Sequence, residues 1–339
     1  MMEKVRCGVM GFGFMGKTHA LNLVKHPNAS LDAVFSLGDD RAAVEKMGAS
    51  FHEDWHEMIE RDDLDAIVIA TPTFTHGDIT LEALEQGKHV FLEKPMERTV
   101  EKSRMIMDAS EKAGVQLAMG HVLRFDPRYI GLRQKAFTGS IGTVKMIRCT
   151  RRGAPPSWGT WFFDEVKSGT VILDLSIHDI DYIKWMAGSM PRKVTAMASM
   201  LDFEGRRVQG ISHIIMEFEP RDQIEANIKI ELGFAEASWG ASSTFPFSTL
   251  VEISGNRGLI ESSVPGNHSL DIFSEGGHQV ESNYRDDAYS LEMDDFIRAV
   301  IGGRPPKVTA REGFEAVQVC LAALESARTG SSITLEEIS

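Results

Sequence analysis

The sequence predicts an α/β fold in two domains. Residues 1–122 are expected to form a parallel sheet with crossover helices, because apolar strand-like runs alternate there with helical stretches. Residues 123–339 are expected to form an α+β domain with a large, mixed and mainly antiparallel open sheet. Long strand-like segments follow one another there at hairpin spacing, which is typical of antiparallel pairing. A length of 339 residues also suits two domains.

In the first domain, expected strands and helices take turns along the chain. The run AIVIA at residues 66–70 is continuously apolar, which indicates a strand buried on both faces. Proline and glycine mark the ends of the helical stretches. The expected strands are 5–10, 31–35, 66–70, 90–92 and 115–119, and the expected helices are 17–26, 38–48, 79–86 and 99–113.

The second domain has a different order of expected strands and helices. A loop rich in Gly, Pro and Trp at residues 153–159 separates an early strand from a helix with apolar residues at helical spacing. Its expected strands are 143–152, 193–201, 209–219, 224–235, 246–254 and 258–262, and its expected helices are 170–187 and 311–329.

The net charge, the apolar runs and the cysteine positions argue against several classes of partner and site. The formal net charge of −13 argues against nucleic acid or an anionic membrane as a partner. No run approaches the ~18 apolar residues of a membrane helix, and the start of the sequence lacks a secretory signal pattern. Cys7, Cys149 and Cys320 lie far apart, which fits a reducing cytoplasm and predicts no metal site.

Residues 11–18 (GFGFMGKT) match two phosphate-binding motifs. As G-x-G-x-x-G they predict a Rossmann dinucleotide site, and as G-x-x-x-x-G-K-[ST] they predict a P-loop. A P-loop also needs an acidic residue for Mg²⁺, which Asp174 would supply if residues 171–174 were a strand. Apolar residues recur there at helical spacing instead, so we favour the dinucleotide site.

The residue that reaches the adenosine ribose is expected about 20 positions after the glycine turn. Ser36 occupies that position, where Asp or Glu would favour NAD. No Arg follows it directly to hold a 2′-phosphate, although Arg41 is near. The choice between NAD and NADP therefore stays open.

Two patterns carry candidate chemistry. Glu93-Lys94-Pro95 ends a predicted parallel strand, at the sheet edge where ligands bind, and a lysine there can stabilise negative charge on oxygen. In the predicted helix 170–187, Asp174, His178 and Asp181 share one stripe, so a carboxylate can orient a histidine base. A surface lysine and a solvated polar helix face are the simpler alternatives.

Taken together, these motifs resemble the Gfo/Idh/MocA family of NAD(P)-dependent oxidoreductases, which includes inositol 2-dehydrogenase. The resemblance covers nearly the whole chain. Its most specific part is the segment 168–181, combined with Glu93-Lys94-Pro95. The other matching motifs are Gly11–Gly16, Ala70–Thr73 with His76, Gly120-His121, Arg124-Phe125, and Tyr289 with Glu292 and Phe296.

The resemblance implies a role for each matching residue. His178 is implied as the catalytic acid/base, Asp174 as its orienting partner and Lys94 as the group that polarises the reacting oxygen. The implied substrate residues are Arg124, Trp161, Asp181 and Tyr289. The expected cofactor-binding residues are Gly11, Phe12, Gly13, Phe14, Met15, Gly16, Ser36, Thr71, Pro72, His76, Glu93 and Lys94.

The implied activity is hydride transfer between NAD or NADP and a ring hydroxyl of a cyclitol, sugar or sugar derivative. A nucleotide-sugar dehydrogenase, a dihydrodiol dehydrogenase, an aldose dehydrogenase and a non-catalytic dinucleotide-sensing regulator are the alternatives. The family also implies a homodimer or homotetramer formed through the C-terminal sheet. Ser168-Gly169-Thr170 departs from the three glycines common in the family.

Overall fold

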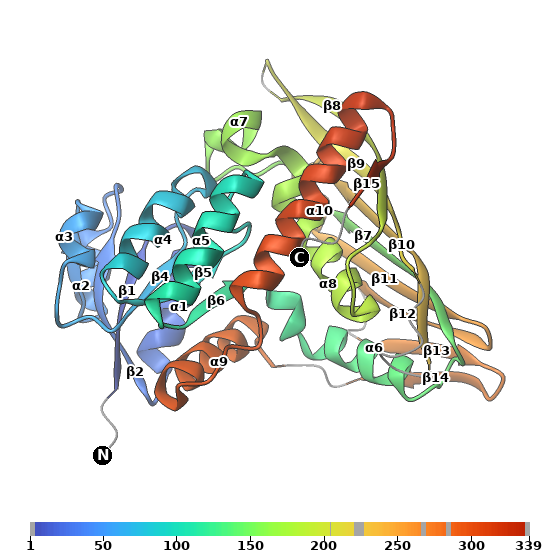
Figure 1. The fold of residues 1–339 in the computed structure, drawn as a ribbon, viewed down its shortest axis with the longest axis horizontal. Helices are drawn as coiled ribbons and strands as arrows, with labels where there is room; N and C mark the ends of the chain where they lie inside the picture. The colour runs from blue at the N-terminus through green and yellow to red at the C-terminus, as the bar shows by residue number, and fades with distance from the viewer. Residues whose placement is uncertain (1–3, 204, 220–226, 266–268, 283–285, 336–339) are drawn as a thin grey trace. The chain divides into compact units, whose positions relative to one another are not determined.

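The computed structural model describes residues 4–203, 205–219, 227–265, 269–282 and 286–335 (Figure 1). The chain divides into two compact units. The first contains Met1–Val122 and Asp287–Val317, and the second contains Leu123–Asp286 and Gln318–Ser339. The sequence analysis assigned residues 287–317 to the second domain. In the structure they belong to the first unit, because the helix they contain packs into its core.

The described part of the first unit contains a six-stranded parallel sheet. The strand order β3-β2-β1-β4-β5-β6 changes direction between β1 and β4, which is the point where doubly wound sheets bind ligands. The buried strand predicted at residues 66–70 is β4, at the centre of this sheet. The strands are β1 (Val5–Met10), β2 (Ala29–Phe35), β3 (Ser50–His52), β4 (Ala66–Ile69), β5 (His89–Glu93) and β6 (Leu117–Gly120).

Helices cover both faces of this sheet. Right-handed crossovers place the helices that follow β1 and β4 on opposite faces, since the strand order runs in opposite directions from the centre. The helices are α1 (Phe14–Lys25), α2 (Arg41–Lys46), α3 (Trp55–Ile59), α4 (His76–Glu85), α5 (Val100–Ala113) and α9 (Ala288–Gly302).

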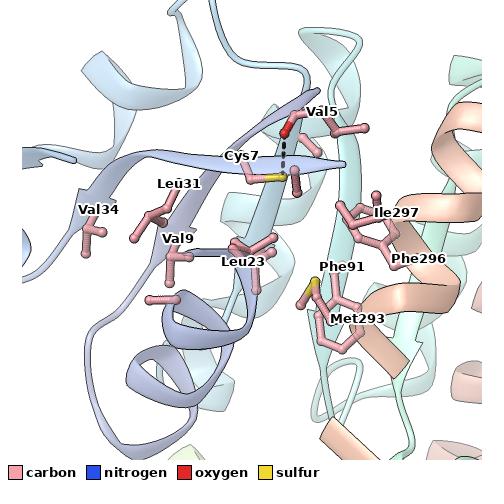
Figure 2. Packing of buried hydrophobic residues seen from close by; sticks show 14 of the residues in the cluster. Val5, Cys7, Val9, Leu23, Leu31, Val34, Phe91, Met293, Phe296 and Ile297 are labelled. Atoms are coloured by element: carbon pink, nitrogen blue, oxygen red, sulfur yellow. Dashed lines mark hydrogen bonds between the residues drawn. The ribbon is translucent and has the colours of Figure 1, made fainter. Parts of the chain in front are cut away.

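Helix α9 is the late segment that joins the first unit. It contacts α1 and β1, and three of its apolar side chains lie in the same buried cluster as Phe91 of β5. Figure 2 shows Met293, Phe296 and Ile297 gathered beside Phe91, whose ring centroid is 5.8 Å from that of Phe296. This apolar stripe gives α9 its place in the first core.

The described residues of the second unit form a nine-stranded sheet in the order β14-β13-β12-β11-β7-β10-β9-β8-β15. Strands β7 and β10 pair in parallel and the other neighbours pair antiparallel, as predicted for a mixed sheet. The strands are β7 (Val144–Arg152), β8 (Lys193–Phe203), β9 (Arg206–Glu217), β10 (Ile228–Ser238), β11 (Ser248–Gly255), β12 (Gly258–Val264), β13 (Leu270–Ser274), β14 (Gly277–Glu281) and β15 (Ile333–Thr334).

Burial alternates along the strands of this sheet, which means that one face is covered. Helix α8 contacts β7 and β10, and α6 contacts β12 and β13. On the other face, Met197, Ile215 and Phe273 are exposed. The helices are α6 (Pro127–Phe137), α7 (Glu165–Ser168), α8 (Ile177–Ala187) and α10 (Ala310–Thr329), and the boundary between the two units falls within α10.

The sequence analysis did not predict several short or weakly patterned elements, namely β3, α3, α6, α7, α9, β13, β14 and β15. The expected strand 224–235 corresponds to β10, and its first three residues lie outside the described ranges. The helix expected at 170–187 contains a π turn at Ile172–Ser176, followed by α8. No helix in the described ranges is both long enough and apolar enough to cross a membrane.

Candidate active site

The glycine turn lies between β1 and α1, and two of its glycines are sterically required. Gly11 has a φ of +88°, and a Cβ there would lie 2.7 Å from the carbonyl oxygen of Ala70. A Cβ on Gly16 would lie 1.9 Å from the carbonyl oxygen of Gly11. A Cβ on Gly13 would meet nothing within 4 Å, and Gly13 caps α1 without a side-chain hydrogen bond. A backbone open to close approach at a helix N-terminus fits the pyrophosphate of a dinucleotide.

Phe12, Phe14 and Met15 complete the turn with apolar side chains. Phe12 is buried, Met15 is partly buried and Phe14 is exposed. Lys17, which made the turn resemble a P-loop, has its ammonium 3.2 Å from Asp40 Oδ1 and 5.1 Å from the centroid of the Phe12 ring. The segment 171–174 is helical rather than a strand, so the acidic element of a P-loop is not formed by Asp174.

Ser36 follows β2 and holds a carboxylate that the sequence analysis did not single out. Its hydroxyl donates to Asp40 Oδ2 at 2.7 Å and accepts from the backbone N–H of Gly38 at 3.1 Å. Asp40 therefore brings a negative charge to the strand end that was expected to meet the ribose. A serine four residues before an aspartate at a helix start is the signal that was available in the sequence.

The loop after β4 contains Thr71, Pro72 and a 3₁₀ turn at Thr73–Thr75. The Thr75 hydroxyl lies 2.8 Å from both the Thr71 hydroxyl and the Pro72 carbonyl oxygen. His76 is buried, with its ring nitrogens 2.8 Å and 2.9 Å from the carbonyl oxygens of Pro95 and Thr71. Burial lowers the pKa of His76. This histidine joins the loops that follow β4 and β5.

Lys94 directly follows β5, and its peptide bond to Pro95 is cis. Its backbone N–H donates to the Glu93 side chain, from Lys94 N to Glu93 Oε2, at 3.2 Å. Glu93 is buried, and its Oε1 lies 2.7 Å from His19 Nε2. Burial alone would raise the pKa of Glu93, but the hydrogen bond from His19 and the charges of His19 and Lys94 outweigh it and lower that pKa.

Tyr289 and Glu292 lie on α9, within the first unit. The Tyr289 ring is 6.3 Å from the His19 ring, edge to face. Glu292 is buried, and burial followed by the charges of Glu93 and Asp287 raises its pKa well above the usual range. His19 had no assigned role in the sequence analysis, although it lies three residues after Gly16, on the face that α1 turns inward.

The predicted acid/base residues lie in the second unit. Asp174 is in the π turn and His178 is in the first turn of α8, and both side chains are partly buried. A π turn interrupts the regular spacing that placed Asp174 one α turn before His178. Such turns occur often at functional sites, and this one coincides with the segment that carries the candidate base.

Two aspartates of α8 form buried pairs with arginines. Arg124 Nε and Nη2 donate to the Asp181 oxygens at 2.9 Å and 2.7 Å. Arg151 Nε and Nη2 donate to the Asp179 oxygens at 3.1 Å and 2.8 Å. The structure thus brings together two predicted substrate residues, Arg124 and Asp181, as a bidentate ion pair.

Trp161, the remaining predicted substrate residue, lies in a 3₁₀ turn at Thr160–Phe163. Its ring stacks on Phe162, with centroids 3.9 Å apart. A Cβ on Gly159 would lie 2.7 Å from the indole nitrogen of Trp161, so the backbone before this turn is held close to the ring.

The comparisons with known proteins agree with this architecture. A profile of the Gfo/Idh/MocA family, described as an oxidoreductase family with an NAD-binding Rossmann fold, matches residues 5–121. A second profile, for the C-terminal alpha/beta domain of the same family, matches residues 134–335. The chain belongs to the Gfo/Idh/MocA family.

Membership in the Gfo/Idh/MocA family makes the chain an NAD-binding oxidoreductase and decides between the two interpretations of the glycine turn. Among its relatives, scyllo-inositol 2-dehydrogenase (NAD(+)) of Bacillus subtilis is 30% identical, covering 99% of this chain and 98% of that protein. Myo-inositol 2-dehydrogenase of Thermotoga maritima is 29% identical, covering 98% and 99%.

Solved structures superpose over nearly the full length of the chain. A putative myo-inositol dehydrogenase from Sinorhizobium meliloti matches with a TM-score of 0.80 at 26% identity, covering 98% of this chain and 100% of that chain. GenD2 from gentamicin A biosynthesis, in complex with NAD, matches with a TM-score of 0.87 at 24% identity, covering 99% and 97%, which supports the fold.

Proposed function

We propose that this chain is an NAD-dependent dehydrogenase that oxidises a ring hydroxyl of a cyclitol, sugar or sugar derivative, or reduces the matching ketone. The observation that carries the proposal is the full-length likeness to inositol 2-dehydrogenases in a chain that has Lys94, Asp174 and His178 in the family's motifs. The glycine turn, with its open backbone at Gly13, would hold the pyrophosphate.

The proposed chemistry uses Lys94, Asp174 and His178 together with the bound dinucleotide. When bound, NAD⁺ supplies the acceptor for hydride from the carbon that bears the hydroxyl. A ring nitrogen of His178 accepts the hydroxyl proton, and Asp174 orients the imidazole. The Lys94 ammonium donates a hydrogen bond to the same oxygen and stabilises its developing negative charge. In the reverse direction, His178 returns the proton.

Asp40 favours NAD over NADP in this proposal. Its carboxylate is held by Ser36 at the end of β2, where a carboxylate can accept hydrogen bonds from the ribose hydroxyls. The same charge repels the 2′-phosphate of NADP. Arg41 does not offset it there, because its guanidinium lies 3.4 Å from Glu53.

The test is steady-state oxidation of a panel of cyclitols, aldoses and nucleotide sugars, followed by absorbance of the reduced nicotinamide. His178→Ala should lower kcat by about 10²–10⁴-fold, the usual contribution of general acid–base catalysis, and Lys94→Met by about 10²–10³-fold, the usual contribution of one donor that stabilises negative charge on oxygen. His278→Ala is the matched control, because His278 is an exposed histidine of the same unit that pairs with Asp271.

Equal rates for His178→Ala and the unsubstituted chain would refute the proposed role of His178. Tight NAD binding with no turnover over the whole panel would favour a dinucleotide-sensing regulator instead.

A homodimer or homotetramer formed through the second sheet is part of the same proposal. The support is apolar side chains on the open face of that sheet, among them Met197, Ile215 and Phe273. Light scattering of the unsubstituted chain and of Met197→Asp tests it. The proposal predicts a smaller particle for the variant, and a monomer in both cases contradicts it.

A further inference from the structure

Three buried ionisable side chains meet beneath the strand end that carries Lys94. His19 comes from α1, Glu93 from the end of β5 and Glu292 from α9, all within the first unit. Their relative exposures are 0%, 6% and 1%, and one nitrogen or oxygen from each lies within 4.8 Å of the others. We call these three residues the His19 cluster.

The members of the His19 cluster are unequally paired. Glu93 uses both carboxylate oxygens, one with His19 Nε2 and the other with the backbone N–H of Lys94. Glu292 has both oxygens buried and without a hydrogen-bond partner among the described residues. His19 Nδ1 is likewise buried without a partner in that part of the chain. Both carboxylate oxygens of Glu93 therefore accept a hydrogen bond, whereas neither oxygen of Glu292 has a partner among the described residues.

The hydrogen-bond partners indicate which carboxyl of the His19 cluster is ionised and which is protonated. Against an ionised Glu93, His19 Nε2 is the donor of the 2.7 Å hydrogen bond to Oε1. Phe91, at 4.9 Å from the His19 ring, contributes to an apolar setting in which two adjacent carboxylates cannot both ionise. Glu93 keeps the negative charge, because it has two donors. Glu292 keeps the proton.

We infer that the His19 cluster consists of positioning residues, in which a neutral Glu292 and an ionised Glu93 bonded to His19 hold the Glu93–Lys94 turn in one orientation. The inference rests on the role proposed above for Lys94. Ionised Glu292 would repel the Glu93 carboxylate and compete for the proton of His19. A neutral Glu292 leaves the Glu93 carboxylate free to bind the Lys94 backbone.

A glycine on the neighbouring strand also helps to position the Glu93 side chain. Gly120 pairs with Glu93 across β5 and β6, and a Cβ on Gly120 would lie 3.1 Å from the carboxylate carbon and Oε2 of Glu93. That separation is tighter than ordinary van der Waals contact. A glycine therefore leaves room for the carboxylate on the side opposite its bond to His19.

The same three side chains are also a set that could bind a transition metal. Two ligands about 2.0–2.1 Å from a tetrahedral zinc ion lie roughly 3.3 Å apart. His19 Nε2 and Glu93 Oε1 are only 2.7 Å apart, which is a hydrogen-bond distance. The geometry thus favours a proton over a metal ion.

The first test detects the proton without using activity. Infrared difference spectra between the unsubstituted protein and Glu292→Gln, at neutral pH, should contain the C=O stretch of one protonated carboxylic acid. Asp295→Asn is the matched control, because Asp295 is a buried carboxylate of the same helix that is bonded to Arg304. Absence of the band would overturn the inference, as would one equivalent of bound metal that Glu292→Gln loses.

The second test separates positioning from general stability. Glu292→Ala should lower kcat about tenfold with the NAD dissociation constant within twofold, since misplacement of a catalytic group costs rate. Glu292→Gln, which imitates the neutral acid, should restore kcat to within twofold. A Glu292→Ala variant that loses only thermal stability, as expected for Asp295→Asn, would overturn the inference. If Glu292→Ala does not fold, Gly120→Ala perturbs Glu93 from the other side and should show the same loss of kcat.

Lys94→Met distinguishes the two proposals. If it retains full activity, the proposed role of Lys94 fails, while the infrared band of Glu292 persists. If Lys94→Met is inactive and the band is absent, only the inference about the His19 cluster fails.

Discussion

The two units bury carboxyl groups in different ways. In the second unit, Asp179 and Asp181 each have a guanidinium of their own, from Arg151 and Arg124, bound through two hydrogen bonds. We call each of these two bidentate ion pairs a locked pair. In the first unit, Glu93 is bonded to the imidazole of His19, and Glu292 lies beside this pair without a hydrogen-bond partner among the described residues. Glu93 and Glu292, beside one histidine, are inferred to carry one negative charge and one proton.

The two units differ because arginine and histidine are chemically different partners for a carboxyl group. Arginine stays charged at any working pH, and its planar fork matches a carboxylate. Burial alone would lower the pKa of Arg151, but the charge of Asp179 reverses this and raises it. Histidine titrates near neutral pH, so its pairs respond to their surroundings. The stability of the first unit should therefore depend on pH, and that of the second unit on keeping both charges of each arginine–aspartate pair.

The largest effect is expected when a locked pair is broken. Arg151→Met leaves Asp179 buried without its cation and should lower the free energy of unfolding by about 3–5 kcal/mol. Urea unfolding followed by circular dichroism measures this. The double variant Arg151→Met with Asp179→Leu removes both charges and should recover most of the loss. An unchanged midpoint in the single variant would mean that the pair contributes nothing to stability.

The second locked pair should behave differently, because Arg124 and Asp181 are proposed to bind substrate. Arg124→Lys keeps the charge but loses the bidentate fork, so the KM for the polyol should rise about tenfold, which corresponds to roughly 1.4 kcal/mol. Arg151→Lys is the matched control and should lower stability while leaving KM unchanged. Equal KM changes in both variants would show that the pairs do not differ in role.

The proton inferred on Glu292 predicts that stability depends on pH. A carboxyl with a raised pKa in the folded state stabilises the fold below its unfolded pKa, about 4.3, and loses that contribution as pH rises toward the folded value. Glu292→Gln has no proton to lose. Its melting temperature relative to the unsubstituted chain should therefore increase from pH 5 to pH 9. A flat difference for Glu292→Gln would exclude the raised pKa.

How far the sequence predicted the structure depends on the range of the interactions. The alternation around Ala66–Ala70 predicts the parallel sheet because a buried strand leaves its pattern in consecutive residues. The His19 cluster combines side chains from residues 19 to 292, and no local pattern indicates which helix covers which strand. The π turn at Ile172–Ser176 escaped for a similar reason, since its spacing differs from that of an α-helix by a single residue.

The smallest expected effect concerns Asp40, a carboxylate between the two extremes. It is only partly buried, and its carboxylate is held by the Ser36 hydroxyl and the Lys17 ammonium rather than by a guanidinium. Asp40→Asn removes the charge and keeps the shape. Stability should change by less than about 0.5 kcal/mol, as at most surface sites.

The ratio of kcat/KM for NAD⁺ to that for NADP⁺ should fall about tenfold in Asp40→Asn, because a 2′-phosphate no longer meets a carboxylate, a gain of roughly 1.4 kcal/mol. The neighbouring exposed Asp39 provides the control, since Asp39→Asn changes the net charge equally. If both variants shift the ratio alike, the preference reflects the overall field of the acidic surface. If only Asp40→Asn shifts it, then the carboxylate held by Ser36 discriminates between the cofactors.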